Sequence, residues 1–160
     1  MKKSKNKKNH KVVMVSGGFD PIHIGHIRYM REAKTLGDRL VVVINNDNWL
    51  RQKKGKAFMH ENDRKEIIEA IECVDEVILS DHPENSDDRS VCKEIEKVKP
   101  HIFANGGDRF ADNIPEFQVC NRLGIKMVFN VGHGGKIRSS SELLKQYLDE
   151  KKSKNTKKKK

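Results

Sequence analysis

The residues with the clearest chemical potential lie in segment 17–26, which reads GGFDPIHIGH. Glycines at its start allow the backbone to approach a phosphate closely, because they carry no side chain. The N–H groups of a helix expected to start at Gly25 attract anions. His23 and His26 can donate hydrogen bonds to phosphoryl oxygens whose charge grows in a transition state. The segment therefore predicts a site for a nucleoside triphosphate.

The apolar pattern around this segment indicates which elements position it. Strands are expected at residues 12–16, 40–44, 74–79, 101–104 and 126–131. Helices are expected at residues 25–36, 61–73, 87–98, 115–123 and 140–148. Strands that alternate with helices predict an α/β fold, here a Rossmann-like five-stranded parallel sheet with helices on both faces, in a single domain over residues 12–150.

Polar and glycine-rich segments follow three of the expected strands. They are the glycine turn that begins at residue 17, the sequence NND at 45–47 and the sequence NGGD at 105–108. Ligands of such sheets bind beyond the carboxyl ends of the strands. We therefore expect these three segments to converge on one crevice.

The pattern HIGH at 23–26, preceded by GGFD at 17–20, resembles the HxGH signature of the nucleotidyltransferase superfamily. The similarity extends over residues 12–148 and is greatest to the glycerol-3-phosphate cytidylyltransferase family. It implies that His23 and His26 stabilise a pentacoordinate transition state without a covalent enzyme intermediate. It also implies nucleotide binding by Gly17, Gly18, Phe19, Asp20 and Gly25.

Lysines dominate the segment 52–57, QKKGKA, and Arg64 follows it at the start of an expected helix. Flexible lysines can reach phosphates as point charges. The resemblance implies that this loop binds the substrates, with Lys53 acting in catalysis and Lys56 and Arg64 contacting the acceptor. A solvated surface loop is the alternative.

Three residues near the expected strand ends are candidate site residues, and two of them have a second interpretation. Asp20 either contacts the ligand or only organises the turn before Pro21. Asp47 and Trp49 are expected to bind the acceptor, although a core or interface position is the simpler reading for the tryptophan.

Two further segments are expected to bind the nucleotide. Gly106 and Asp108 lie after a strand, where close contact with a base or ribose is possible, and the alternative is an ordinary turn. Their GGD sequence resembles the heptose-phosphate adenylyltransferases. Serine hydroxyls and the N–H groups at the start of the helix expected at residues 140–148 can together bind an anion. The resemblance implies that the superfamily's closing motif contacts the β- and γ-phosphates at this place. The residues that match this motif are Arg138, Ser139, Ser140 and Ser141.

The expected reaction joins a nucleoside monophosphate to a small phosphorylated acceptor and releases pyrophosphate. The resemblance favours CTP and an acceptor such as glycerol 3-phosphate, and the GGD sequence favours ATP with a sugar phosphate or a mononucleotide. Magnesium is expected to accompany the triphosphate, with no protein metal site. A homodimer is expected, although Glu72 replaces an arginine of the family. A noncatalytic nucleotide-binding regulator is the alternative from another class.

Basic residues are concentrated at the two ends of the chain. Segments 1–11 and 151–160 hold 13 of the 33 Lys and Arg residues, which leaves 20 basic against 23 acidic residues between them. We expect both ends to be disordered tails, for which a solubilising role or a mere compositional bias is favoured over nonspecific contact to nucleic acid or anionic membranes. Three widely spaced cysteines without a CxxC pair argue against a disulfide framework or zinc, which fits a cytoplasmic protein.

Overall fold

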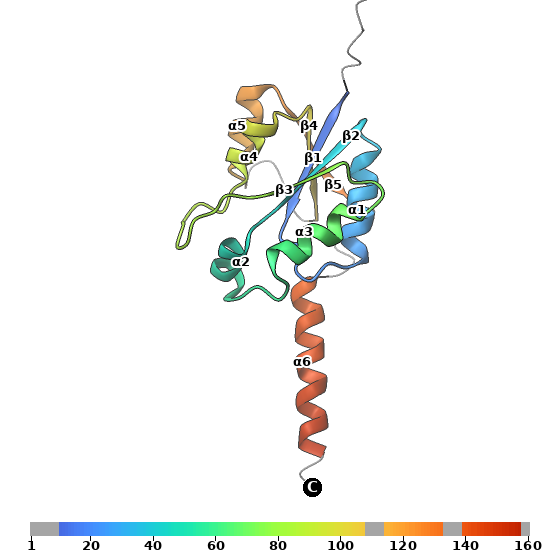
Figure 1. Cartoon of the computed structure of the whole chain (residues 1–160), viewed down its shortest axis with the longest axis vertical. Helices are drawn as coiled ribbons and strands as arrows, with labels where there is room; N and C mark the ends of the chain where they lie inside the picture. Colours follow the sequence, from blue (N-terminus) through green and yellow to red (C-terminus); the bar gives the residue numbers. More distant parts are fainter. Residues whose placement is uncertain (1–9, 108–113, 133–138, 158–160) are drawn as a thin grey trace, which may run out of the picture.

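The computed structural model describes residues 10–107, 114–132 and 139–157. Five parallel strands form one sheet in the order β3-β2-β1-β4-β5, which confirms the predicted Rossmann-like fold (Figure 1). The strands are β1 (Val12–Gly17), β2 (Arg39–Ile44), β3 (Glu76–Leu79), β4 (Ile102–Gly106) and β5 (Lys126–Val131).

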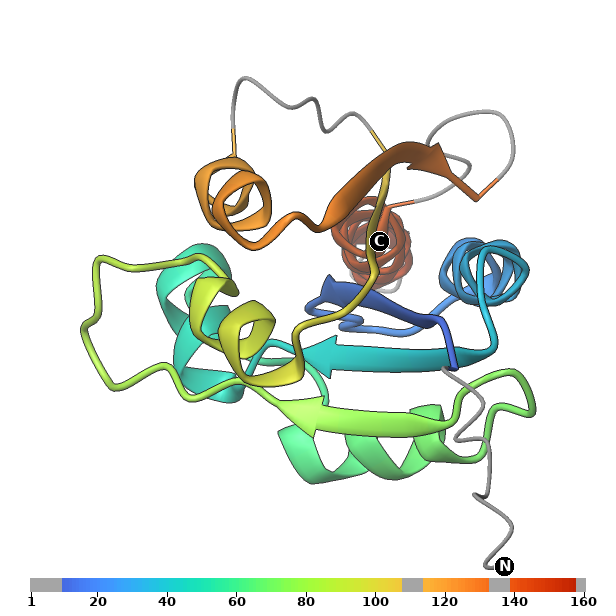
Figure 2. The ribbon, with the colours of Figure 1, turned by 90° about the horizontal axis from the view of Figure 1, so that it is seen from above.

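Helices cover both faces of the sheet, as predicted. The helices are α1 (Ile24–Lys34), α2 (Asp47–Lys54), α3 (Glu61–Glu69), α4 (Cys92–Val98), α5 (Glu116–Leu123) and α6 (Ser140–Lys157), of which α1, α3, α4 and α5 cover the sheet. Helices α1 and α3 pack on one face, and α4 and α5 pack on the other (Figure 2). Each strand in the middle is therefore covered on two sides, which is why these strands are nearly continuous apolar runs rather than alternating ones.

Strand β1 lies between β2 and β4, at the point where the strand order reverses. Val13, Met14 and Val15 are fully buried, with side chains alternating between the two helical layers. The carboxyl ends of β1, β2 and β4 meet at the same edge of the sheet. Of the three segments that the sequence predicted to converge there, the glycine turn and residues 105–107 line one cavity, whereas residues 45–47 do not line it.

Helix α2 is the largest difference from the predicted elements. No element was expected over residues 47–54 and a loop was expected at 52–57, but DNWLRQKK forms a helix, whose start Asn46 caps by accepting from the Trp49 N–H. Gly55, with a φ of 83°, ends it in the left-handed conformation that favours glycine. Helix α4 begins at Cys92 rather than at residue 87.

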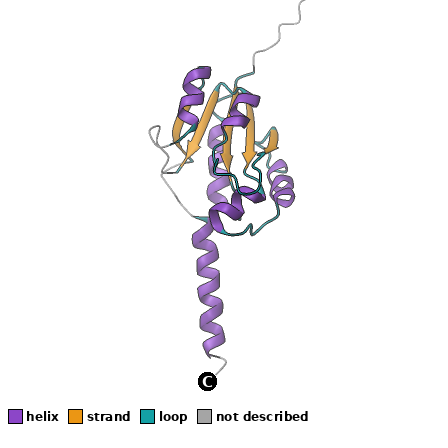
Figure 3. Ribbon diagram, turned by 90° about the vertical axis from the view of Figure 1, so that its left-hand side faces the viewer, coloured by secondary structure: helices purple, strands orange, loops and turns teal. Residues whose placement is uncertain are grey.

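Helix α6 also exceeds its predicted length. It continues to Lys157 and projects from the end of the domain (Figure 3). The structure therefore differs from the expected disordered tail over residues 151–157. Lysine is a good helix former and residues 140–157 contain neither glycine nor proline, so nothing in the sequence stops the helix. Within the described ranges, no helix is long and apolar enough to cross a membrane.

Candidate active site

A cavity of about 530 Å³ opens at the carboxyl edge of the sheet. Its walls come from the glycine turn, the start of α1, helix α2, the end of β4 and the start of α6. The expected site residues that line it are Gly17, Gly18, Phe19, His23, Gly25, His26, Trp49, Lys53, Gly106, Ser139, Ser140 and Ser141.

His23 and His26 together cap the first turn of α1. The His23 side chain accepts a hydrogen bond from the Gly25 N–H at 3.1 Å, and the His26 side chain accepts one from the His23 N–H at 3.3 Å. The two rings stack with centroids 3.7 Å apart. A Cβ on Gly25 would lie 2.9 Å from the His23 ring, so only glycine lets that ring fold back over the helix start.

These hydrogen bonds define where the imidazoles carry their protons. A backbone N–H can only donate, so Nδ1 of each ring accepts and Nε2 carries the hydrogen. Burial lowers the pKa of His26 to about 3, with further lowering from the charges of His23 and Lys54. His26 is therefore a neutral Nε2–H donor at neutral pH. Such a donor stabilises charge that develops on a phosphoryl oxygen without being a proton source.

The turn before these histidines is held by the buried Asp20 carboxylate. Its two oxygens accept hydrogen bonds from the Phe58 and Met59 N–H groups, each at 2.7 Å. Asp20 is 1% exposed, and its carboxylate fixes the loop that follows α2 against the glycine turn. The structure thus supports the turn-organising interpretation of this residue.

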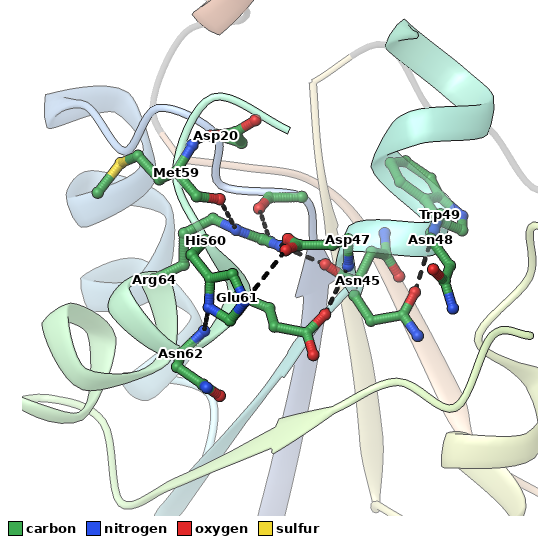
Figure 4. Close-up of polar contacts among 12 residues, drawn as sticks. Asp20, Asn45, Asp47, Asn48, Trp49, Met59, His60, Glu61, Asn62 and Arg64 are labelled. Atoms are coloured by element: carbon green, nitrogen blue, oxygen red, sulfur yellow. Dashed lines mark hydrogen bonds and ion pairs between the residues drawn. The ribbon is translucent and has the colours of Figure 1, made fainter. Parts of the chain in front are cut away.

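Arg64 does not reach the cavity, contrary to the expected contact with the acceptor. Its side chain is fully buried and donates to the carbonyl oxygens of Gly18, Asn45 and Met59 (Figure 4). It also pairs with the Asp47 carboxylate at 2.7 Å. Burial of a charged side chain requires such a full set of partners. Arg64 therefore joins the ends of β1 and β2 to the loop before α3.

Asp47 belongs to the same buried cluster rather than to the cavity wall (Figure 4). It is 5% exposed, and one carboxylate oxygen accepts from Arg64. Its backbone N–H donates to the Glu61 carboxylate at 2.7 Å. These contacts connect the start of α2 with the start of α3, and the expected role in acceptor binding does not fit them.

Helix α2 presents two lysines to the cavity, of which sequence analysis singled out only one. The Lys53 Nζ lies 4.5 Å from the centre of the Trp49 ring. The Lys54 Nζ donates to the Asp20 carbonyl oxygen at 3.0 Å, and its charge acts on His26. Desolvation lowers the pKa of Lys54, although the Asp20 carboxylate partly raises it. Lys56 is exposed and does not line the cavity.

The start of α6 closes the cavity on another side. The Ser140 hydroxyl donates to the Pro21 carbonyl oxygen at 2.8 Å, which joins the two helix starts of α1 and α6. Helix N-termini carry partial positive charge, so two of them at one cavity favour a polyanion. Arg138, expected beside these serines, lies outside the described residues.

Tyr29 of α1 and Asn105 at the end of β4 also line the cavity, and the sequence had placed only Asn105, within the NGGD segment, at a strand end. The Tyr29 hydroxyl donates to the Ala104 carbonyl oxygen at 2.6 Å, and Tyr29 lines the cavity. Asn105 also lines it, is 2% exposed, and its amide nitrogen has no hydrogen-bond partner in the described part of the chain. Neither residue type is diagnostic in sequence, because only the fold places it at the cavity. Asp108 lies outside the described residues.

No group of three His, Cys, Asp or Glu side chains among the described residues could hold a metal ion. Each Asp20 carboxylate oxygen on the glycine turn accepts a hydrogen bond from a backbone N–H group. The described residues therefore do not fit a metal site built by the protein alone.

Comparisons with known proteins agree on the kind of enzyme. Residues 14–146 match a family model described as cytidylyltransferase-like. An FAD synthase of Ferroglobus placidus is 39% identical over 72% of this chain and 72% of its own length. An FAD synthase of Thermoplasma volcanium is 34% identical over 86% of this chain and 94% of its own length.

A second group of relatives and a solved structure extend the comparison. The bifunctional protein HldE of Citrifermentans bemidjiense is 33% identical over 86% of this chain, which spans 27% of that longer protein. The crystal structure of a lipopolysaccharide core biosynthesis protein from Thermoplasma volcanium superposes with a TM-score of 0.64 at 31% identity. That match covers 78% of this chain and 99% of the other. With its HxGH cavity and these relatives, the chain belongs to the cytidylyltransferase-like family of nucleotidyltransferases.

Proposed function

We propose that the protein transfers AMP from ATP to a small phosphorylated acceptor, and specifically to FMN. The observation that carries nucleotidyl transfer is the pair of Nε2–H imidazoles facing one cavity with two helix starts. Support for the substrates comes from the two relatives named FAD synthase, both of which match most of this chain. FAD consists of FMN and AMP joined through a pyrophosphate bond, so ATP and FMN are the substrates that nucleotidyl transfer requires.

The geometry suits a single in-line displacement at phosphorus. A phosphate oxygen of the acceptor attacks the α-phosphorus, the bond from that phosphorus to the bridging oxygen breaks, and pyrophosphate leaves with the electron pair. The Nε2–H groups of His23 and His26 donate to the oxygens that gain charge. Lys53 and Lys54 neutralise the phosphates as point charges, and the Ser139–Ser141 run holds the β- and γ-phosphates. The enzyme supplies position and charge, and no covalent intermediate is needed.

CMP transfer to glycerol 3-phosphate, which sequence analysis favoured, is the second candidate. It is supported by the cytidylyltransferase-like description of the family model and by the lysines of α2. We place ATP first because two of the relatives named above are FAD synthases, and because the GGD sequence at 106–108 resembles adenylyltransferases.

A pyrophosphate-release assay tests both candidates. ATP and CTP are each combined with FMN, glycerol 3-phosphate, a sugar 1-phosphate or nicotinamide mononucleotide, with His23→Ala as the inactive control. We expect release with ATP and FMN and formation of FAD, which absorbance and chromatography identify. Release with CTP and glycerol 3-phosphate would favour the second candidate. Nucleotide binding without release in any combination would favour a regulator.

Magnesium is expected to enter this reaction bound to the triphosphate rather than to the protein. Mg²⁺ prefers phosphate oxygens and retained water, and it neutralises charge on the leaving pyrophosphate. The described residues offer no three-ligand cage for it. We expect titration of Mg²⁺ without nucleotide to show no binding, and turnover to cease in excess chelator.

The homodimer and a role for the lysine-rich ends stay predictions. Light scattering of the purified chain measures whether it is a homodimer. Retention on heparin, compared between the full chain and one shortened by residues 1–9 and 158–160, tests the role of the lysine-rich ends.

A further inference from the structure

A buried polar cluster lies outside the cavity, in the loop between β3 and α4. His82 is 7% exposed, with Ser80 and Ser90 at 4% and 8%. The His82 Nδ1 lies 2.7 Å from the Ser80 hydroxyl, and its Nε2 lies 2.9 Å from the Ser90 carbonyl oxygen. Both ring nitrogens are therefore used within the protein, and the proposed chemistry does not involve them.

The partners determine the direction of each hydrogen bond. The Ser90 carbonyl oxygen can only accept, so Nε2 of the neutral His82 ring carries the proton and donates. Nδ1 then accepts from the Ser80 hydroxyl. That hydroxyl oxygen in turn accepts from the Asn46 N–H at 3.0 Å. One directed chain of hydrogen bonds thus runs from the residue before α2, through His82, to the end of the loop.

The same loop holds helix α2 at three more points. The His82 carbonyl oxygen accepts from the side-chain amides of Asn46 at 2.8 Å and of Asn48 at 3.0 Å. The Trp49 indole N–H donates to the Arg89 carbonyl oxygen at 2.9 Å. Every one of these contacts falls on the first turn of α2 or on its cap.

Helix α2 needs such support, because it cannot hold its own position. It is eight residues long, and Trp49 and Leu50 are its only buried apolar side chains. Helices this short are marginal in water without tertiary contacts. Yet the same helix carries Trp49, Lys53 and Lys54 to the cavity wall.

We propose that His82 is a positioning residue, which fixes the 80–91 loop against the start of α2 and thereby sets the place of Trp49 and Lys53 in the cavity. The proposal rests on the cavity being the active site and not on which nucleotide or acceptor is used. His82 itself touches no substrate.

The chain provides a direct probe, because Trp49 is its only tryptophan. Intrinsic fluorescence and its quenching by acrylamide report on α2 with no substrate present. The variants are His82→Leu and the milder Ser80→Ala, with Ser80→Thr to restore the hydroxyl. His101→Leu is the matched control, since His101 is an exposed histidine at the opposite end of the sheet.

We expect His82→Leu and Ser80→Ala to shift the Trp49 emission to the red and to increase quenching. We also expect the KM for the nucleoside triphosphate to rise roughly tenfold in Ser80→Ala, the scale set by loss of one buried hydrogen bond. Ser80→Thr should restore both readouts, and His101→Leu should change neither.

A lower melting temperature with unchanged emission, quenching and KM would overturn the proposal, because it would show a role in stability alone. If His82→Leu fails to fold, the Trp49 emission, quenching and KM of Ser80→Ala and Ser80→Thr test the proposal instead. Should no turnover be found with any substrate, fluorescence still tests the placement of α2, so failure of the proposed function and failure of this inference are distinguishable.

Discussion

The two walls of the cavity are built in different ways. The wall at the start of α1 is local, since the hydrogen bonds of its histidines join residues two or three positions apart. The wall at α2 depends on partners distant in sequence, such as the Trp49 bond to Arg89 across 40 positions and the Asn48 bond to the His82 carbonyl oxygen across 34. The placement of the two histidines is thus set mostly by neighbours in the sequence, whereas the placement of α2 requires the 80–91 loop to be folded against it.

Arg64→Ala should break the α2 wall most severely. It would leave the Asp47 carboxylate buried without its cation, and three carbonyl oxygens without their donor. Removing one member of a buried pair costs about 3–5 kcal/mol of unfolding free energy. Urea denaturation of the variant measures this loss.

Arg39→Ala is the matched control, because the Arg39–Glu76 pair is exposed on the surface. Exposed ion pairs contribute about 0–1 kcal/mol to the free energy of unfolding, so the urea midpoint of Arg39→Ala should hardly differ from that of wild type. Equal losses in the two variants would show that Arg64 does not organise the cavity in the way described.

His23→Ala and His26→Ala should test the local wall through activity rather than stability. Each removes one donor to the transition state, and we expect turnover to fall by about a hundredfold or more. Single-turnover rates with saturating substrates measure the effect, and circular dichroism checks the fold. Turnover within a fewfold of wild type in either variant would rule out the catalytic assignment.

Ser140→Ala should weaken binding of the triphosphate more than binding of the acceptor. The hydroxyl ties the α6 start to Pro21, and Ser139 and Ser141 remain as partial substitutes. We expect a loss of ~1–2 kcal/mol in nucleotide affinity, the scale of a hydrogen bond to a charged group. Separate titrations of each substrate check this, and an increase confined to the acceptor KM would reverse our orientation of the site.

His26 should make stability depend on pH in a predictable direction. The pKa of His26 is about 3 in the folded protein against 6.5 for an ordinary histidine, so below pH 6.5 the unfolded chain binds a proton that the folded chain refuses. The free energy of unfolding therefore falls by at most about 1.4 kcal/mol per pH unit as pH falls from 6.5 towards 3. Urea denaturation at pH 7 and pH 5 measures how far the free energy of unfolding decreases between the two, and this decrease should be smaller for His26→Gln than for wild type. Identical decreases would mean that His26 is protonated in the fold.

The contrast between the walls also explains what the sequence could predict. The five strands, the α1 start and both histidines follow from apolar runs and a short motif, and the structure confirms the predicted sheet. Helix α2 was missed because its sequence is polar and its start is held by hydrogen bonds to the 80–91 loop, which is distant in sequence. The burial of Arg64 could not be predicted, because an arginine near lysines has the same composition whether it binds a ligand or fills a core.

The hydrogen bond between Ser140 and Pro21 joins a residue that is synthesised late to one that is synthesised early, so the cavity is completed only after residues 139–141 have been made. Residues 139–141 lie after every strand of the sheet, while the histidines they face lie near the beginning. A chain ending at residue 132 would retain all five strands and the α1 start but lack the serine run. We expect such a chain, and a nascent chain of that length, to bind nucleotide weakly if it folds. The enzyme would thus acquire its activity only with its last helix.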